Sequence, residues 1–311
     1  MRSSSRQRIL STPFILLAVS FLAFLLPELQ GVDQARVTLF ARSQEAEPTE
    51  AAIAAISAEL GLDDPLLVRY GRYLGDIATG DLGTSNVSRS PVGPQVWHAT
   101  VVSATVVALA MAAAVLSATV LGVVAAANQN RWPDKLITGA SRVLVAIPIH
   151  VLTPVLVFIA ALRLDLDPTS GWGSASHLVL PVIALAVSPA ALFSQVVRSE
   201  MLDTLEQPYI RTALAKGLTW RRVVWVHAAR VSLVGVLTLG SLFVAGLLGG
   251  AVIAEVILGV PGLGRLLHTA VTSSDVPMFQ GGLLVAVASG VFVGLLGDLV
   301  SGLLSPPNGD G

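Results

Sequence analysis

The sequence predicts an all-α protein that crosses a membrane several times, and three observations support this fold class. The mean hydropathy is +0.75 and only 13% of the residues are charged, about half the share of a soluble domain. Six charge-free stretches are long enough for a helix to cross a hydrocarbon core about 30 Å thick. These stretches are continuously apolar and do not alternate, which excludes a transmembrane barrel. They are residues 9–26, 99–130, 143–162, 178–197, 231–254 and 276–297.

The composition also excludes several classes of function. The formal net charge of −1 leaves no excess of basic residues for neutralising nucleic-acid phosphates. The 311 residues include no cysteine, so the chain has no disulfide, thiolate nucleophile or Cys-ligated metal. The five histidines show no metal-binding spacing, and no metal site is predicted. No G-x-x-x-x-G-K-[ST] motif occurs, so the chain has no P-loop of its own for ATP.

The first apolar stretch follows several arginines and therefore also resembles a signal peptide. No small-x-small cleavage site follows Leu26, so we expect residues 1–27 to be a retained first transmembrane helix. Prolines inside the later stretches are expected to produce ordinary kinks, because neighbouring helices can cover the carbonyl groups that proline leaves free. These are Pro148, Pro154, Pro181 and Pro189.

The distribution of Arg and Lys predicts the orientation of the helices in the membrane. Basic residues gather before the first stretch, in the second connection and in the fourth connection. The short connections on the opposite side hold only Arg163 and Arg265. Because basic loops stay in the cytoplasm, both termini are predicted to be cytoplasmic, with residues 305–311 as a cytoplasmic tail.

Residues 28–98 form a polar connection on the external side that is too long for a plain loop. Residues 50–74 have the spacing of an amphipathic helix, with a helix start at Thr49 and Glu50. We therefore expect a small folded cap on the external face. The alternative of a disordered loop is less favoured because the segment is rich in Leu and Tyr.

The fourth connection, residues 198–230, is predicted to be a cytoplasmic helix–turn–helix. Pro208 suits the first turn of a helix, and Ile210, Ala213 and Leu214 then share one face. Gly217 is placed to stop this helix, and Thr219 to cap the next one. Such an element either offers an apolar knob with basic flanks to a partner protein or lies on the inner leaflet through its arginines.

The residues of this connection resemble the coupling segment of dipeptide and oligopeptide ABC-transporter permeases. In the wider superfamily the segment reads Glu-Ala-Ala, three residues, then Gly; Arg211, Thr212, Ala213 and Gly217 stand in those places here. The resemblance continues through residues 209–218, 221–223, 227–228, 248–252, 255, 261–267 and 277–281, and in the first loop through 60–66 and 80–85. One departure is Gly235, where the family often has Pro.

The resemblance implies a type I ABC importer permease fold of six transmembrane helices, without enzymatic activity of its own. Residues 28–98 would be the external cap, 99–304 a five-helix core, and 198–230 the coupling loop. Two homologous permeases would form the pore, two cytoplasmic ATPases would carry ATP and Mg²⁺, and an external binding protein would deliver peptide. Nickel, glutathione and haem are alternative cargoes.

The resemblance also implies two sets of site residues. The ATPase-coupling set is Tyr209, Ile210, Arg211, Thr212, Ala213, Leu214, Lys216 and Gly217. The binding-protein docking set is Asp81, Leu82, Gly83, Thr84, Pro261, Gly262 and Gly264. A proton-coupled secondary transporter is the more distant alternative, because Glu255 and Asp298 lie near the ends of apolar stretches, where ionisable groups are rare.

Overall fold

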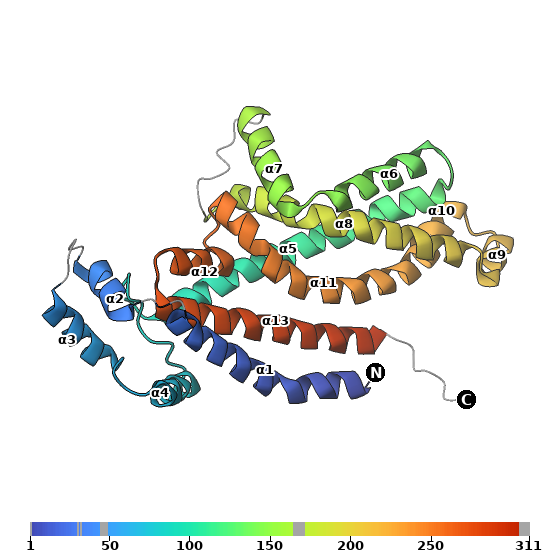
Figure 1. Ribbon diagram of the computed structural model, residues 1–311. Helices are drawn as coiled ribbons and strands as arrows, with labels where there is room; N and C mark the ends of the chain where they lie inside the picture. The colour runs from blue at the N-terminus through green and yellow to red at the C-terminus, as the bar shows by residue number, and fades with distance from the viewer. Residues whose placement is uncertain (1, 30, 32, 44–48, 164–171, 305–311) are drawn as a thin grey trace. The chain divides into compact units, whose positions relative to one another are not determined.

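The computed structural model describes residues 2–29, 31, 33–43, 49–163 and 172–304, and their regular structure is helical (Figure 1). Within these ranges, β-structure is limited to one isolated bridge between Thr84 and Pro91. The described residues form two compact units. The core unit comprises 104–260 and 292–304, and the cap unit comprises 2–103 and 261–291.

Five helical segments are long and apolar enough to cross a membrane, and the number rises to seven if two bent pairs of helices each count as one span. The five predicted stretches other than 143–162 fall, for all or most of their length, within single helices. These helices are α1 (Arg2–Leu29), α5 (Val92–Ala127), α8 (Ala175–Leu205), α11 (Ala229–Leu258) and α13 (Val276–Leu304). The prediction of a polytopic helical membrane protein is confirmed.

The stretch 143–162 is not one continuous helix, so the expectation of an ordinary kink at Pro148 was wrong. Helix α6 (Trp132–Ala146) ends before Pro148, and α7 (Ile149–Arg163) begins directly after it. The axes of the two helices are bent by 110°. Proline lacks a backbone N–H and disfavours helical geometry in the preceding residue. Ile147 accordingly has an extended backbone, with φ −83° and ψ 116°. Pro154, Pro181 and Pro189 do lie inside helices, as expected.

Helix α8 is the centre of the core unit, and α6 and α11 both pack against it. Phe193 of α8 is fully buried and meets Phe243 of α11 edge to face, with 5.3 Å between the ring centroids. Helix α5 approaches α8 closely at Gly122, where an added Cβ would lie 2.8 Å from the carbonyl oxygen of Ser194. The small residue at this position therefore lets the two backbones pack closely.

In the cap unit, aromatic side chains of α1 and α4 (Leu66–Thr79) pack against one another. Tyr70 packs against Phe21 with ring centroids 5.2 Å apart, and Tyr73 packs against Phe24 at 5.7 Å. Arg69 of α4 forms an ion pair of 2.8 Å with Glu28 of α1. Burial, and secondarily the neighbouring Tyr70, raise the pKa of Tyr73 to about 12. Phe24 is buried, whereas Phe21, Tyr70 and Tyr73 are half-buried, so the contacts attach one side of α4 to α1.

The amphipathic helix predicted over 50–74 is two helices. Helix α3 (Glu50–Leu60) starts where expected, since the Thr49 side chain accepts a hydrogen bond from the backbone N–H of Ala52. It ends at Gly61, whose φ of +62° closes the last turn, and α4 begins after Pro65. A short α2 (Gln34–Ser43), which the sequence did not predict, precedes them.

Candidate functional site

The predicted coupling segment is built on α9 (Pro208–Ala215), a short helix that follows α8 (Figure 1). Gln207 is extended and Pro208 occupies the first helical turn, as its fixed φ favours. Gly217 has φ +84°, and its N–H donates to the carbonyl of Leu214 at 2.9 Å. The N–H of Leu218 donates to the carbonyl of Ala213 at 3.2 Å. The predicted helix stop at Gly217 is therefore confirmed.

The apolar face predicted on this helix is divided between the interior and the surface. Ile210 is only 1% exposed, so it anchors α9 within this chain and does not reach a partner. Leu214 is 38% exposed and Ala213 is half-buried. The expectation that Ile210, Ala213 and Leu214 together enter a partner's groove is therefore wrong for Ile210. A three- or four-residue spacing shows which residues share a face, but it does not show which part of that face the chain itself covers.

The exposed part of the segment combines aromatic and basic side chains. Tyr209 and Trp220 are 47% and 49% exposed. Arg211, Thr212, Lys216 and Gly217 are also exposed. We call this set, together with Leu214, the α9 surface. Aromatic and arginine side chains are the types enriched in protein interfaces.

A π-helix joins this segment to the rest of the core unit, and sequence reasoning missed it. After α10 (Trp220–Arg222), η1 (Val223–Ala228) leads directly into α11. Val223 and Val224 are buried, and η1 packs against both α8 and α9. A π-turn interrupts α-helical hydrogen bonding and often marks a functional position. Thr219 occupies the N-cap position of α10 with an extended backbone, as expected, but its side chain makes no cap hydrogen bond, so the predicted capping interaction is absent.

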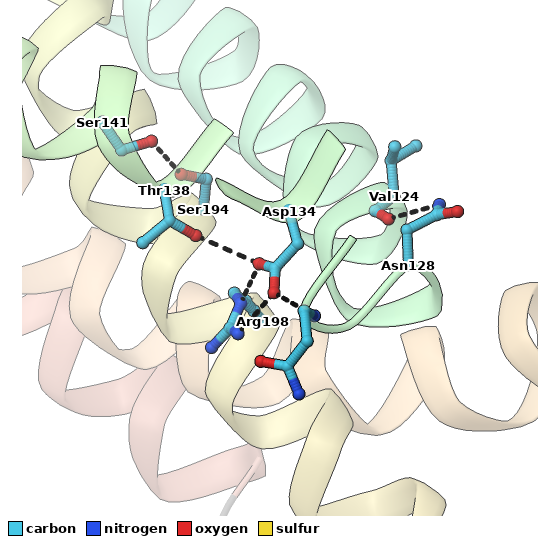
Figure 2. A network of polar contacts seen from close by, with 8 residues as sticks. Val124, Asn128, Asp134, Thr138, Ser141, Ser194 and Arg198 are labelled. Atoms are coloured by element: carbon cyan, nitrogen blue, oxygen red, sulfur yellow. Dashed lines mark hydrogen bonds and ion pairs between the residues drawn. The ribbon is translucent and has the colours of Figure 1, made fainter. Parts of the chain in front are cut away.

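An ion pair joins Arg198 of α8 to Asp134 of α6, about two turns before the end of α8 at Leu205 (Figure 2). Arg198 donates from Nε and Nη2 to the two carboxylate oxygens of Asp134 on α6, at 2.5 and 2.8 Å. Asp134 is 3% exposed. Sequence reasoning missed Asp134, and its signal was an acidic residue in the first turn of a helix directly after Trp132 and Pro133.

The docking set lies in the cap unit, in a tight turn before α5 and at the start of α12 (Leu263–Thr272). The carboxylate of Asp81 accepts from the N–H of Gly83 at 2.8 Å, and Gly83 has φ +80°. The carbonyl of Gly83 accepts from the N–H of Val92 at 2.9 Å, which closes the turn onto α5. Asp81, Gly83 and Thr84 are exposed, and Leu82 is half-buried.

A cavity of about 550 Å³ lies between the residues after this turn and α12. Pro261 and Gly262 line it, whereas residues 81–84 and Gly264 do not. Gly262 and Gly264 are buried at the start of α12, where the N–H of Leu263 donates to Ser103 Oγ at 2.8 Å. The charged and polar side chains of the lining include Ser85, Ser88, Gln95, His98, Arg265 and Asp275.

The carboxylate of Asp275 is a structural feature of this cavity that the sequence reasoning missed. It is 4% exposed, accepts a hydrogen bond from Ser85 Oγ, and accepts from the backbone N–H of Asn86 at 3.1 Å. It also accepts from the N–H of Met278 at 3.4 Å, as an N-cap of α13 does. The position of Asp directly before a helix start was the available signal.

Glu255 and Asp298 are the two carboxylates that a proton-coupled transporter would use. Glu255 is 1% exposed, near the end of α11. Asp298 lies in α13, and its side chain is outside the described part of the chain.

The sequence matches two families along nearly its whole length. Residues 118–307 match the binding-protein-dependent transport system inner membrane component, and residues 4–116 match the N-terminal region of such membrane components.

Curated relatives agree with this assignment. The chain is 32% identical to the dipeptide transport system permease protein of Alkalihalophilus pseudofirmus, covering 98% of this chain and 99% of the relative. It is 33% identical to the glutathione transport system permease protein of Salmonella paratyphi A, covering 96% of each. It is 34% identical to the dipeptide transport system permease protein of Escherichia coli K12, covering 81% and 84%.

These matches, together with several membrane-length helices, make the chain a multi-pass protein of the inner membrane. The resemblance inferred from residues 209–218 and 261–267 is thereby confirmed. The chain belongs to the family of inner-membrane components of binding-protein-dependent transport systems and is the permease subunit of an ABC importer.

Proposed function

We propose that this permease moves small peptides inward by alternating access, and that a cycle of ATP binding and hydrolysis on separate subunits drives the movement. The observation that supports a peptide as the cargo is the near full-length similarity to permeases named for dipeptides. Glutathione is the second candidate, because a relative named for it is equally similar. Both candidates are small peptides, so the class of cargo is the same.

The proposed partners are a second homologous permease, two ABC ATPases that bind ATP and Mg²⁺, and an external binding protein. Both termini would be cytoplasmic, which follows from the Arg and Lys of the second and fourth connections. No cofactor is proposed for this chain itself. Its sequence has no P-loop, so the chemistry of ATP is assigned to other subunits.

The α9 surface is proposed to contact the ATPase. Tyr209, Leu214 and Trp220 provide exposed apolar area, and Arg211 and Lys216 flank it with positive charge. Ile210 holds the helix to its own chain, so a push on the surface is passed to η1 and α8. This arrangement supports a coupling role more than a helix lying passively on lipid.

The cavity of the cap unit is proposed to receive the external binding protein. The carboxylate of Asp275 accepts hydrogen bonds from Ser85 and Asn86. Arg265 is exposed in the lining, and its positive charge favours an acidic side chain on the docking protein.

Reconstituted transport tests the proposed function. The chain and its native partners are placed in proteoliposomes with ATP inside and a collapsed proton gradient, and uptake of a labelled dipeptide is measured. Uptake should require ATP, binding protein and all subunits. Uptake that instead needs a proton gradient and is abolished by Glu255→Gln would favour a secondary transporter. Competition of unlabelled glutathione with the labelled dipeptide distinguishes the two peptide cargoes.

A further inference from the structure

We infer that the pair Asp134–Arg198 locks α6 to α8, so that movement of α9 is delivered to the break at Ile147 and Pro148. This inference rests on the proposed coupling role of α9. It assigns Asp134 and Arg198 a positioning role in transport, which neither their sequence positions nor the family assignment gives them.

The pair fixes both distance and direction (Figure 2). Two parallel N–H···O bonds between a guanidinium and a carboxylate form a planar fork, which resists rotation as well as separation. The carboxylate is also held from its own side. Its oxygens accept from the backbone N–H of Asn130 at 2.8 Å and from Thr138 Oγ1 at 3.2 Å. Asp134 therefore cannot follow Arg198 by a simple change of rotamer; α6 must move with it.

A second contact lies farther along the same two helices. Ser141 of α6 and Ser194 of α8 are both buried, and their hydroxyl groups are 3.0 Å apart (Figure 2). Ser141 lies two turns after Asp134, and Ser194 lies about one turn before Arg198, as expected for antiparallel neighbours. Two contacts along the helices prevent α6 from pivoting about the ion pair alone.

Burial keeps the ion pair closed. Asp134 is almost completely inaccessible, and a buried carboxylate that loses its partner is strongly disfavoured. Separating α6 from α8 during a transport cycle would create such a carboxylate. The two helices are therefore expected to move as one body.

The ion pair lies between α9 and the break before α7, so a rigid unit of α6 and α8 would connect the two. Arg198 precedes the end of α8 at Leu205 by about two turns, and α9 follows at Pro208. At its other end, α6 reaches the 110° break before α7. Displacement of α9 would thus travel along α8, cross to α6 through the pair, and change the bend at Pro148.

Spin labels test this movement directly, because the chain has no native cysteine. Lys135 on α6 and Ser199 on α8 are exposed, as is Phe158 on α7. The complete transporter is labelled at Lys135→Cys with Ser199→Cys, or at Lys135→Cys with Phe158→Cys. Distances are measured without nucleotide and with ATP under conditions that block hydrolysis. The first distance should stay constant and the second should change. A changing α6–α8 distance, or a constant distance across the break, overturns the inference.

Variants of the pair separate a positioning role from simple charge balance. Arg198→Lys keeps the charge but loses the fork, and Asp134→Leu with Arg198→Leu removes both charges together. Each should lower the peptide transported per ATP hydrolysed by about five- to tenfold. ATPase co-purification should be unchanged, and Lys135→Gln is the matched control beside Asp134. Normal coupling in the double variant would overturn the inference.

The failure of this inference is distinguishable from the failure of the proposed function. Ala213→Glu on the α9 surface is measured in the same assay. If Ala213→Glu loses coupling while the double variant keeps it, α9 couples without this pair. If Ala213→Glu also keeps coupling, the proposed role of α9 itself is wrong.

Discussion

Gly217 is the residue at which backbone geometry is most directly linked to the proposed coupling. Its φ is +84°, and no atom of the described residues lies within 4 Å of a Cβ added there. Within this chain, the cost of a substitution is therefore the left-handed conformation. That cost is about 1–2 kcal/mol for an ordinary residue and smaller for Asn.

We predict that Gly217→Val impairs ATP-coupled uptake while Gly217→Asn retains most of it. The β-branched valine disfavours the turn that ends α9, whereas asparagine tolerates it. The measurement is binding-protein-stimulated ATPase activity and uptake in proteoliposomes. Lys216→Ala should cause a smaller loss than Gly217→Val, because an exposed charge contributes about 0–1 kcal/mol. Equal loss in Val and Asn variants would show that side-chain volume, and not backbone geometry, is limiting.

Substitutions at Ile210 and at Leu214 are predicted to impair different properties of α9. Ile210→Ala removes a buried anchor, at a cost of about 2–5 kcal/mol, and should expose α9 to proteolysis. Leu214→Asp changes the partly exposed surface and should weaken ATPase co-purification without exposing α9. Limited proteolysis and co-purification are measured on both variants. If Leu214→Asp leaves ATPase binding intact, the α9 surface does not contact the ATPase.

At Gly235 the space that a Cβ would take is filled by the carboxylate of Glu200, the far end of a flexible side chain of α8. Glu200 can move aside by a change of rotamer. We therefore predict that Gly235→Ala lowers stability by no more than about 1 kcal/mol and that adding Glu200→Ala removes this loss. Thermal unfolding of the purified variants in detergent checks this. Additive losses in the double variant would show that the two residues do not limit each other.

At the scale of elements, apolar stretches predicted which segments are helices, and the interruptions were less predictable. The start at Pro208 and the stop at Gly217 followed from local backbone preferences that a sequence displays. Proline inside an apolar stretch is compatible with either a kink or a break, and the kink predicted at Pro148 is a break in the structure. The choice depends on packing between α6 and α8, which the sequence does not display.

In the candidate site, too, features with a local sequence signal were predictable, and features that depend on packing were not. The residues of α9 were found from motif and spacing, but the burial of Ile210 depends on η1 and had no local signal. Asp134 and Arg198 are separated by 64 residues. Their pairing required the antiparallel contact of two helices, and charge distribution along the chain could not reveal it.

Docking of the external binding protein is predicted to depend on Arg265 of α12. Arg265→Glu should weaken stimulation of transport by the binding protein, because it reverses the accessible charge of the cavity. The concentration of binding protein needed for half-maximal uptake should rise, while ATPase co-purification stays normal. Arg265→Lys, which keeps the charge, is the control. An unchanged requirement for binding protein would place the docking site elsewhere.

At the scale of the whole molecule, orientation in the membrane is the principal prediction. Ala58 and Thr219 are both exposed, in α3 and just before α10. In intact cells, a membrane-impermeant thiol reagent should label Ala58→Cys and should not label Thr219→Cys. Permeabilised cells provide the control, since both positions should then react. Labelling of Thr219→Cys from outside would reverse the orientation derived from the Arg and Lys distribution.

The π-helix η1 has a consequence for how this permease tolerates changes in chain length. A π-turn holds one residue more than the α-helical turn it replaces. Deleting one residue there, for example the exposed Val226, would let the segment close as ordinary α-helix. Because the lost residue is the extra one, the parts of the chain on either side of η1 would keep nearly their present orientation, whereas the same deletion in an ordinary α-helix would rotate one side by about 100° about the helix axis and shift it by about 1.5 Å. Such an allele would produce a permease that inserts in the membrane in normal amount, with the segment that carries α9 still facing its usual direction.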